Sequence, residues 1–167
     1  MVWNIEPYVG LGPLRFGMTP EEVAAFDGEM GAVALRHHPD VLGHITEVRR
    51  QFVHGFEFRN NKLISIGTSK RSKGVVFYEG VDVFGVEPVE LVKWLERKNG
   101  GAKMNFACVF FDRLGFVLSD FYFWKERRFF QLSSGEQDDR KLGVYSEEAV
   151  AITLKIPGFE FEDVSFL

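Results

Sequence analysis

Histidine and aspartate side chains are close together in the segment His37-His38-Pro39-Asp40, which could supply two or three ligands to a metal ion. Imidazole and carboxylate groups suit zinc or manganese, and His44 could join them from a neighbouring loop. Pro39 places the segment in a loop, and its spacing matches no helical two-histidine motif. A small-ligand or metal-dependent enzyme using His37, His38 and Asp40 is an alternative function, although we expect no metal and no other cofactor.

Other catalytic chemistries have weaker signals in the sequence. The only cysteine, Cys108, lies in an apolar run, where we expect it to be buried and unreactive. With a single cysteine, the chain cannot form an internal disulfide. The glycine-rich residues 10–17 precede a helix start but lack the lysine ending of a P-loop and the spacing of a dinucleotide fingerprint. Ser133 and Ser134 are not in a nucleophile-elbow pattern. The sequence therefore predicts a protein that is not an enzyme and has no catalytic residues.

The net charge of −4 is distributed unevenly along the chain. Residues 49–73 contain seven basic groups and one acid, whereas residues 134–167 contain eight acids and three bases. The basic stretch, with Phe52, Phe56 and Phe58 between its charges, is typical of a surface that stacks nucleic-acid bases. However, the alternation of these phenylalanines indicates that they point into a core, and the chain is acidic overall. A nucleic-acid binder acting through residues 49–73 is therefore a second alternative, which the sequence disfavours.

Residues 104–132 contain ten aromatic side chains. Neighbouring residues of a strand point to opposite faces, so pairs such as Phe110-Phe111 and Phe129-Phe130 cannot all face one core. Either both faces are covered or some of the aromatics are exposed, as they are at protein interfaces. Coverage by the tail, residues 157–167, or by a second protomer in a homodimer is the alternative explanation.

Two stretches of the sequence resemble each other, and both predict a helix start. Residues 16–23 read Phe-Gly-Met-Thr-Pro-Glu-Glu-Val, and residues 84–91 read Phe-Gly-Val-Glu-Pro-Val-Glu-Leu. In the first copy, Thr19 is placed to cap a helix, with proline at the first helical position and Glu22 completing a capping box. In the second copy, Glu87 occupies the cap position and is a weaker cap.

Strand patterns follow each predicted helix. The expected strands are residues 46–52, 56–58, 63–66, 105–111, 116–123, 129–132 and 151–156, with turns at 60–61 and 112–115. The last of these has the clearest alternation of apolar and other residues. We therefore expect an α+β fold in which two related helix-then-antiparallel-strand halves, about 1–77 and 78–167, form one compact domain. Its sheet would bury one face and leave the other open to a partner.

The N-terminal residues lack the features of a signal peptide, and no apolar run reaches the length of a membrane helix. The sequence thus predicts a cytoplasmic protein without membrane contact.

Residues 12–23, which read Gly-Pro-Leu-Arg-Phe-Gly-Met-Thr-Pro-Glu-Glu-Val, resemble the opening of small bacterial helix-then-sheet repeat domains. The resemblance is to the β-lactamase-inhibitor-protein-like repeat, to outer-membrane-assembly lipoproteins, and to bacterial proteins of the kind found as immunity proteins beside toxins. The chain has no export signal and no lipid-anchor cysteine, unlike the lipoproteins. The resemblance therefore implies a cytosolic, inhibitor-like protein.

Together these observations predict a non-enzymatic protein-binding module, an immunity-type inhibitor that covers a toxin's active site. Because many toxin nucleases have basic clefts, we expect an acidic surface with aromatic anchors to make the contact. The candidate partner-binding residues are Phe123, Trp124, Glu136, Asp138, Asp139, Glu160, Glu162 and Asp163.

Overall fold

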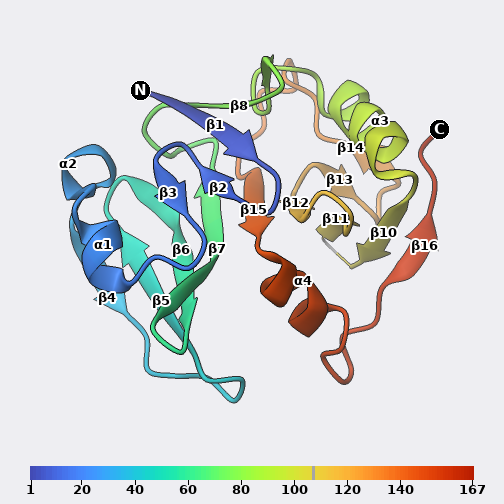
Figure 1. Cartoon of the computed structure of the whole chain (residues 1–167). Coiled ribbons are helices and arrows are strands. Elements are labelled where there is room, and N and C mark those ends of the chain that lie inside the picture. Colours follow the sequence, from blue (N-terminus) through green and yellow to red (C-terminus); the bar gives the residue numbers. More distant parts are fainter. Residues whose placement is uncertain (107) are drawn as a thin grey trace.

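Antiparallel strands dominate the computed structural model, which describes residues 1–106 and 108–167, apart from the side chains of residues 53 and 54. The main sheet has nine strands, each antiparallel to its neighbours. In spatial order they are β16 (Glu162–Val164), β10 (Ala102–Asn105), β11 (Cys108–Phe111), β12 (Phe116–Ser119), β15 (Lys141–Tyr145), β7 (Lys62–Ser69), β6 (Phe52–Arg59), β5 (His44–Arg49) and β4 (Val33–Arg36). Figure 1 shows β4–β7 on one side of the molecule and β10–β12 on the other, with β15 between them.

A smaller sheet and four helices complete the described chain. The small sheet has the order β3 (Leu14–Arg15), β2 (Gly10–Leu11), β1 (Val2–Glu6), β8 (Val75–Tyr78) and β9 (Val81–Asp82), and β13 (Tyr122–Phe123) and β14 (Arg128–Phe129) form a separate ribbon. The helices are α1 (Pro20–Ala24), α2 (Asp27–Met30), α3 (Pro88–Asn99) and α4 (Glu147–Thr153). The fold is therefore of the mixed α+β class and rich in sheet. None of the helices among the described residues has the length and hydrophobicity needed to cross a bilayer.

The main hydrophobic core lies on one face of the nine-stranded sheet and contains side chains from both halves of the chain. Phe52, Phe56 and Phe58 of β6 are fully or almost fully buried there, as are Phe116 of β12 and Val144 of β15. The prediction that the three phenylalanines of β6 point into the core is confirmed. Since side chains alternate along a strand, the residues between them, such as Glu57, point to the opposite face. A smaller cluster of Phe110, Val117 and Val150 lies on the opposite face, where Phe161 of the tail packs against Phe110.

Both predicted helix starts are confirmed, with Thr19 and Glu87 at the two cap positions. The Thr19 hydroxyl accepts the N–H of Glu22, and the Glu22 carboxylate accepts the N–H of Thr19, which makes a complete capping box at α1. Glu87 makes no such bond at the start of α3. That helix ends at Gly100, in a left-handed backbone conformation that glycine adopts without steric cost.

The predicted strand over residues 151–156 is wrong, because residues 147–153 form α4. Ser146 precedes this helix, and its hydroxyl accepts the N–H of Ala149 at 3.1 Å. Two glutamates occupy the first helical turn, where the helix dipole favours negative charge. The upstream cap, and not the apolar alternation that follows, sets the local structure.

Four other predicted strands are shorter than expected. The strand over 46–52 ends at Arg49, with β6 starting at Phe52, and only Phe129 of the strand over 129–132 lies in a strand, β14. The strand over 105–111 is split into β10 and β11, which form a hairpin, and Phe106 in their connection has φ of 40°. The strand over 116–123 ends at Ser119, since Asp120 has φ of 62° and the chain then enters the β13–β14 ribbon. Isolated left-handed residues of this kind leave no hydrophobic pattern in the sequence.

Gly12 packs against the buried indole of Trp3 in the turn between β2 and β3. Its φ is +57°, and a Cβ atom on it would lie 2.6 Å from the Trp3 ring. We expect Gly12→Ala to lower the free energy of unfolding by about 2 kcal/mol in urea denaturation, through backbone strain and overpacking. Gly28→Ala is the control, because its φ is not positive and no atom lies within 4 Å of the place that a Cβ atom would take there. Equal losses in the two variants would contradict this account of Gly12.

Candidate functional site

Two exposed aromatic side chains meet at one end of the second half. Phe106 lies in the β10–β11 connection and is 70% exposed, and Trp124 follows β13 and is 39% exposed. Their ring centroids are 5.8 Å apart in an edge-to-face arrangement. The ammonium group of Lys125 lies 5.8 Å from the centre of the Trp124 ring. The two rings thus shield each other while a large part of their surface faces solvent.

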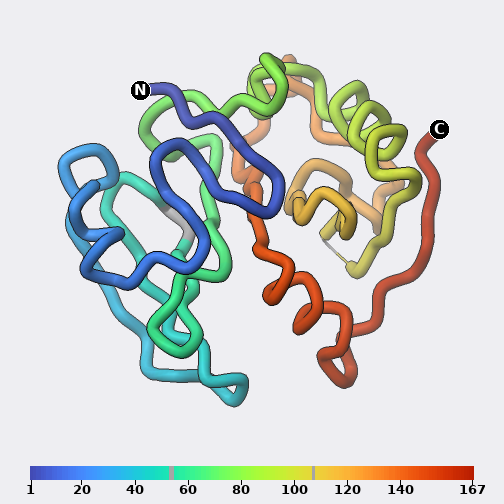
Figure 2. Tube along the Cα trace, viewed as in Figure 1, coloured from blue at the N-terminus to red at the C-terminus, as the bar shows by residue number. Residues whose placement is uncertain are grey.

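The acidic tail runs beside β10, the strand that leads to Phe106. The tail after α4 returns along the outside of the second half and ends in β16, beside β10 (Figure 2). Asn105, the neighbour of Phe106, donates its side-chain N–H to the backbone carbonyl of Glu160. Glu160 and Glu162 are exposed, and the Asp163 carboxylate is 87% exposed although it pairs with Lys103 at 2.8 Å. We call Phe106, Trp124, Glu160, Glu162 and Asp163 the aromatic corner.

Phe123 and Glu136, two other predicted contact residues, both bind Arg128. The Arg128 guanidinium lies 4.6 Å from the centre of the Phe123 ring, which is half-buried. It also donates to Glu136 through two nitrogens, at 3.1 and 2.8 Å, and to Glu126 through its Nε. These hydrogen bonds hold the pKa of Glu136 below its usual value. The charge of Glu136 is therefore largely compensated within the chain.

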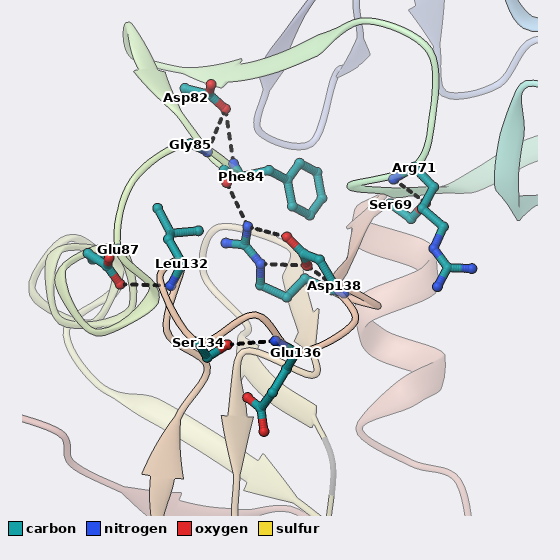
Figure 3. Close-up of polar contacts among 11 residues, drawn as sticks. Ser69, Arg71, Asp82, Phe84, Gly85, Glu87, Leu132, Ser134, Glu136 and Asp138 are labelled. Atoms are coloured by element: carbon teal, nitrogen blue, oxygen red, sulfur yellow. Dashed lines mark hydrogen bonds and ion pairs between the residues drawn. The ribbon is translucent and has the colours of Figure 1, made fainter.

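Asp138 is bound to the buried Arg140. Arg140 donates from Nε and Nη2 to the Asp138 carboxylate at 2.9 and 2.8 Å, and from Nη2 to the carbonyl of Phe84 at 2.7 Å. Its guanidinium also lies 5.0–5.7 Å from the centres of the Phe84, Phe121 and Phe130 rings. Figure 3 shows Asp138 and Phe84 converging on this guanidinium group. Burial would raise the pKa of Asp138, but the hydrogen bonds and charge of Arg140 lower it overall.

Asp139 forms an ion pair with Arg71, and both side chains of this pair are about half exposed. The predicted contact residues are thus held in two ways. Glu136, Asp138 and Asp139 are paired with arginines, while Trp124 packs against Phe106, and Glu160, Glu162 and Asp163 lie on the tail beside β10. Sequence reasoning missed Phe106 because residues 105–111 read as one continuous strand, and only its left-handed backbone brings it to the surface.

The histidine segment is organised around a turn. The Asp40 carboxylate accepts the N–H groups of Leu42 and His44 at 2.8 and 2.9 Å. Burial would raise the pKa of Asp40, but these two donors and the nearby His44 lower it overall. Within the described residues, no three or more His, Cys, Asp or Glu side chains are grouped to hold a metal ion. The side chain of His54 lies outside the described part.

The basic stretch, residues 49–73, presents no aromatic platform from the three phenylalanines considered for base stacking, because all three are in the core. Arg49 is buried and pairs with Glu47 and Asp27. Arg59 pairs with Glu148 at 3.0 Å. These arginines therefore make internal ion pairs.

A hollow of about 250 Å³ lies on the face of the nine-stranded sheet opposite the main core. Strands β5, β6, β7, β15, β12 and β11 all contribute to its lining. The lining residues are Thr46, Gly55, Glu57, Ser65, Gly67, Cys108, Val117, Ser119, Lys141, Leu142, Gly143 and Tyr145. Cys108, which we expected to be buried, is half-buried at its wall, with Sγ 3.3 Å from the Ser119 hydroxyl. Burial, the charge of Glu57 and the nearby Cys108 raise the pKa of Tyr145.

Comparisons with protein-family models, with curated proteins and with solved structures found no match.

Proposed function

We propose that this chain is a non-enzymatic protein-binding module, an immunity-type inhibitor that covers the active site of a toxin in the bacterial cytoplasm. The observation that supports it most directly is the exposure of Phe106 and Trp124 side by side at the surface. Tryptophan is the residue type most enriched among the few side chains that dominate protein interfaces. Two aromatic rings that cover each other only in part are suited to fill a pocket on a partner.

The backbone of Phe106 supports the same proposal. A bulky residue with φ of 40° is held in a conformation that costs about 1–2 kcal/mol relative to the right-handed region. Glycine would occupy the turn without this strain, and it would not expose an apolar ring. Strain of this kind is concentrated at functional sites, where a particular side chain must be presented.

The charges of the aromatic corner favour a basic partner. Glu160 and Glu162 make no ion pair with any described side chain, and the Asp163 carboxylate faces solvent beside its lysine. An acidic rim around aromatic anchors speeds association with a positively charged cleft and disfavours acidic partners. A toxin nuclease with a basic cleft has the required charge.

We also propose that the two halves of the chain are related to each other. In each half a strand of the parallel pair β1–β8 precedes a proline-led helix. Four consecutive strands of the main sheet follow α1 (β4–β7), and β10, β11, β12 and β15 follow α3, with β16 as an additional edge strand. The sheet order runs from β4 to β7 and then from β15 through β12 and β11 to β10, so equivalent strands lie at equal distances from the β7–β15 junction. A tandem duplication followed by symmetric docking would produce this order.

The proposed function can be tested by capture from cells that make the natural partner. A tagged wild-type chain is expected to retain a basic protein that the double variant Glu160→Lys/Glu162→Lys loses. The double variant Glu136→Lys/Asp139→Lys is the control, because it changes the charge equally but alters residues already paired with arginines. Equal retention by both double variants would count against the aromatic corner as the contact surface.

Replacing Phe106 with glycine is expected to raise the free energy of unfolding by about 1 kcal/mol, because glycine removes the left-handed strain. The same variant is expected to bind the partner more weakly. Urea denaturation and calorimetry measure the two effects. Loss of stability in Phe106→Gly would mean that the ring serves the fold instead of a partner.

A further inference from the structure

The hollow on the face of the nine-stranded sheet opposite the main core has a defined arrangement of charge. On one side, Glu57 of β6 lies opposite Ser65 of β7, and Ser65 lies opposite Tyr145 of β15. Four residues further along β7, Ser69 lies opposite Lys141 of β15. The hollow therefore has a carboxylate at one end and an ammonium group at the other.

Neither charge is neutralised by an ion pair within the described chain. The Glu57 carboxylate accepts the Ser65 hydroxyl at 2.7 Å, but no described basic nitrogen lies within 4 Å of it. No described carboxylate oxygen lies within 4 Å of the Lys141 ammonium. Burial raises the pKa of Asp120, and the positive charge of Lys141 partly opposes this rise. Both side chains are only partly exposed. Partly desolvated charges without partners destabilise a fold unless a ligand pairs with them.

Three strands contribute glycines to the middle of the hollow. Gly55 of β6, Gly67 of β7 and Gly143 of β15 all line it, and Gly67 lies opposite Gly143. A Cβ on Gly143 would lie 2.7 Å from the Tyr145 ring, and one on Gly55 would lie 2.4 Å from Thr46 Cγ2. The Tyr145 ring and the Thr46 methyl group thus occupy the space that side chains at these two positions would take, and they form part of the surface between the two charges.

The distance between the two charges indicates the size of the ligand. Four residues along a strand span about 13 Å, and two strand spacings add about 10 Å sideways, so the backbone positions of Glu57 and Lys141 are about 16 Å apart. Amino acids and other small zwitterions are too short to reach both ends. A peptide extended at about 3.3 Å per residue reaches across in four to five residues.

We propose that this hollow is a second binding site, separate from the aromatic corner, for an extended peptide segment that carries one basic and one acidic side chain four residues apart. The basic side chain pairs with Glu57 and the acidic one with Lys141. The Thr46 side chain also lines the hollow, whereas the hydroxyl groups of Ser65 and Ser119 already bind Glu57 and Cys108. Charge complementarity at both ends favours this occupant over an anion, a cation or an apolar ligand.

The test uses the peptide Lys-Ala-Gly-Ala-Glu with blocked ends, titrated into the ¹⁵N-labelled chain and followed by the amide signals of Gly55, Gly67 and Gly143. We expect saturable shifts of all three signals. Peptides with lysine at both ends or glutamate at both ends are expected to bind at least tenfold more weakly. Failure of the first peptide to shift these signals, or equal binding of all three peptides, would overturn the proposal.

A charge exchange in the protein provides a test that is independent of folding losses. Glu57→Lys and Lys141→Glu are each expected to weaken binding of the mixed-charge peptide at least tenfold. The double variant restores one charge of each sign. It is expected to bind the same peptide, in the opposite orientation, with an affinity within threefold of wild type. Absence of this recovery contradicts the proposal. Trp124→Ala should leave the peptide titration unchanged, so this result is distinguishable from failure of the proposed function.

Discussion

Asp138→Ala is expected to lower the free energy of unfolding by about 3 kcal/mol, because it leaves the buried Arg140 guanidinium without its counter-ion. The ion pair is bidentate, and the guanidinium is enclosed by three phenylalanine rings and the Phe84 carbonyl. Among the described acids, only the Asp138 carboxylate lies within 4 Å of the Arg140 guanidinium, so it alone balances the charge of Arg140. Urea denaturation at neutral pH measures the loss.

Asp139→Ala is the matched control for this prediction. It removes a carboxylate from the adjacent position, but its pair with Arg71 is exposed and contributes less than about 1 kcal/mol. Comparable losses in the two variants would contradict a structural role for Asp138. The stabilisation should also depend on pH. Because the pKa of Asp138 is below its ordinary value of 3.8 in the folded chain, the contribution is complete above that value and is lost as the pH falls through the folded-state pKa.

Trp124→Ala is expected to weaken partner binding by at least about 2 kcal/mol, or roughly 30-fold, as truncation of a central aromatic anchor does. Stability should change by less than about 0.5 kcal/mol, since the indole is exposed at a turn. Calorimetry with the captured partner measures the affinity. Leu132→Ala is the control, because Leu132 is 40% exposed, like Trp124, and lies in the loop after β14. If Leu132→Ala weakens binding as much, the contact surface lies elsewhere.

The parts of the fold that were predictable from sequence are those with a local physical cause. The Thr19 capping box, the end of α3 at Gly100 and the turn at Asn60-Asn61 depend on interactions within a few residues. Asn60 and Asn61 have φ of 49° and 60°, a conformation that asparagine tolerates better than most residues. Such local signals can be recognised in a single sequence.

The parts that were not predictable depend on contacts between distant segments. Residues 151–156 alternate like a strand, but residues 151–153 continue the helix that Ser146 caps. Glu136, Asp138 and Asp139 read as a free acidic run, yet each binds an arginine, and Arg71 is far from Asp139 in sequence. The hollow could not be found either, since only strand pairing brings its two charged residues, Glu57 and Lys141, to the same face of one sheet.

Hydrogen–deuterium exchange on the chain with and without its captured partner tests the proposed binding surface most directly. We expect the partner to slow amide exchange in residues 104–106, 122–126 and 159–163, which carry the aromatic corner, and to leave residues 131–139 unchanged. Slowed exchange confined to residues 131–139, with the aromatic corner exchanging as in the free chain, would contradict the account.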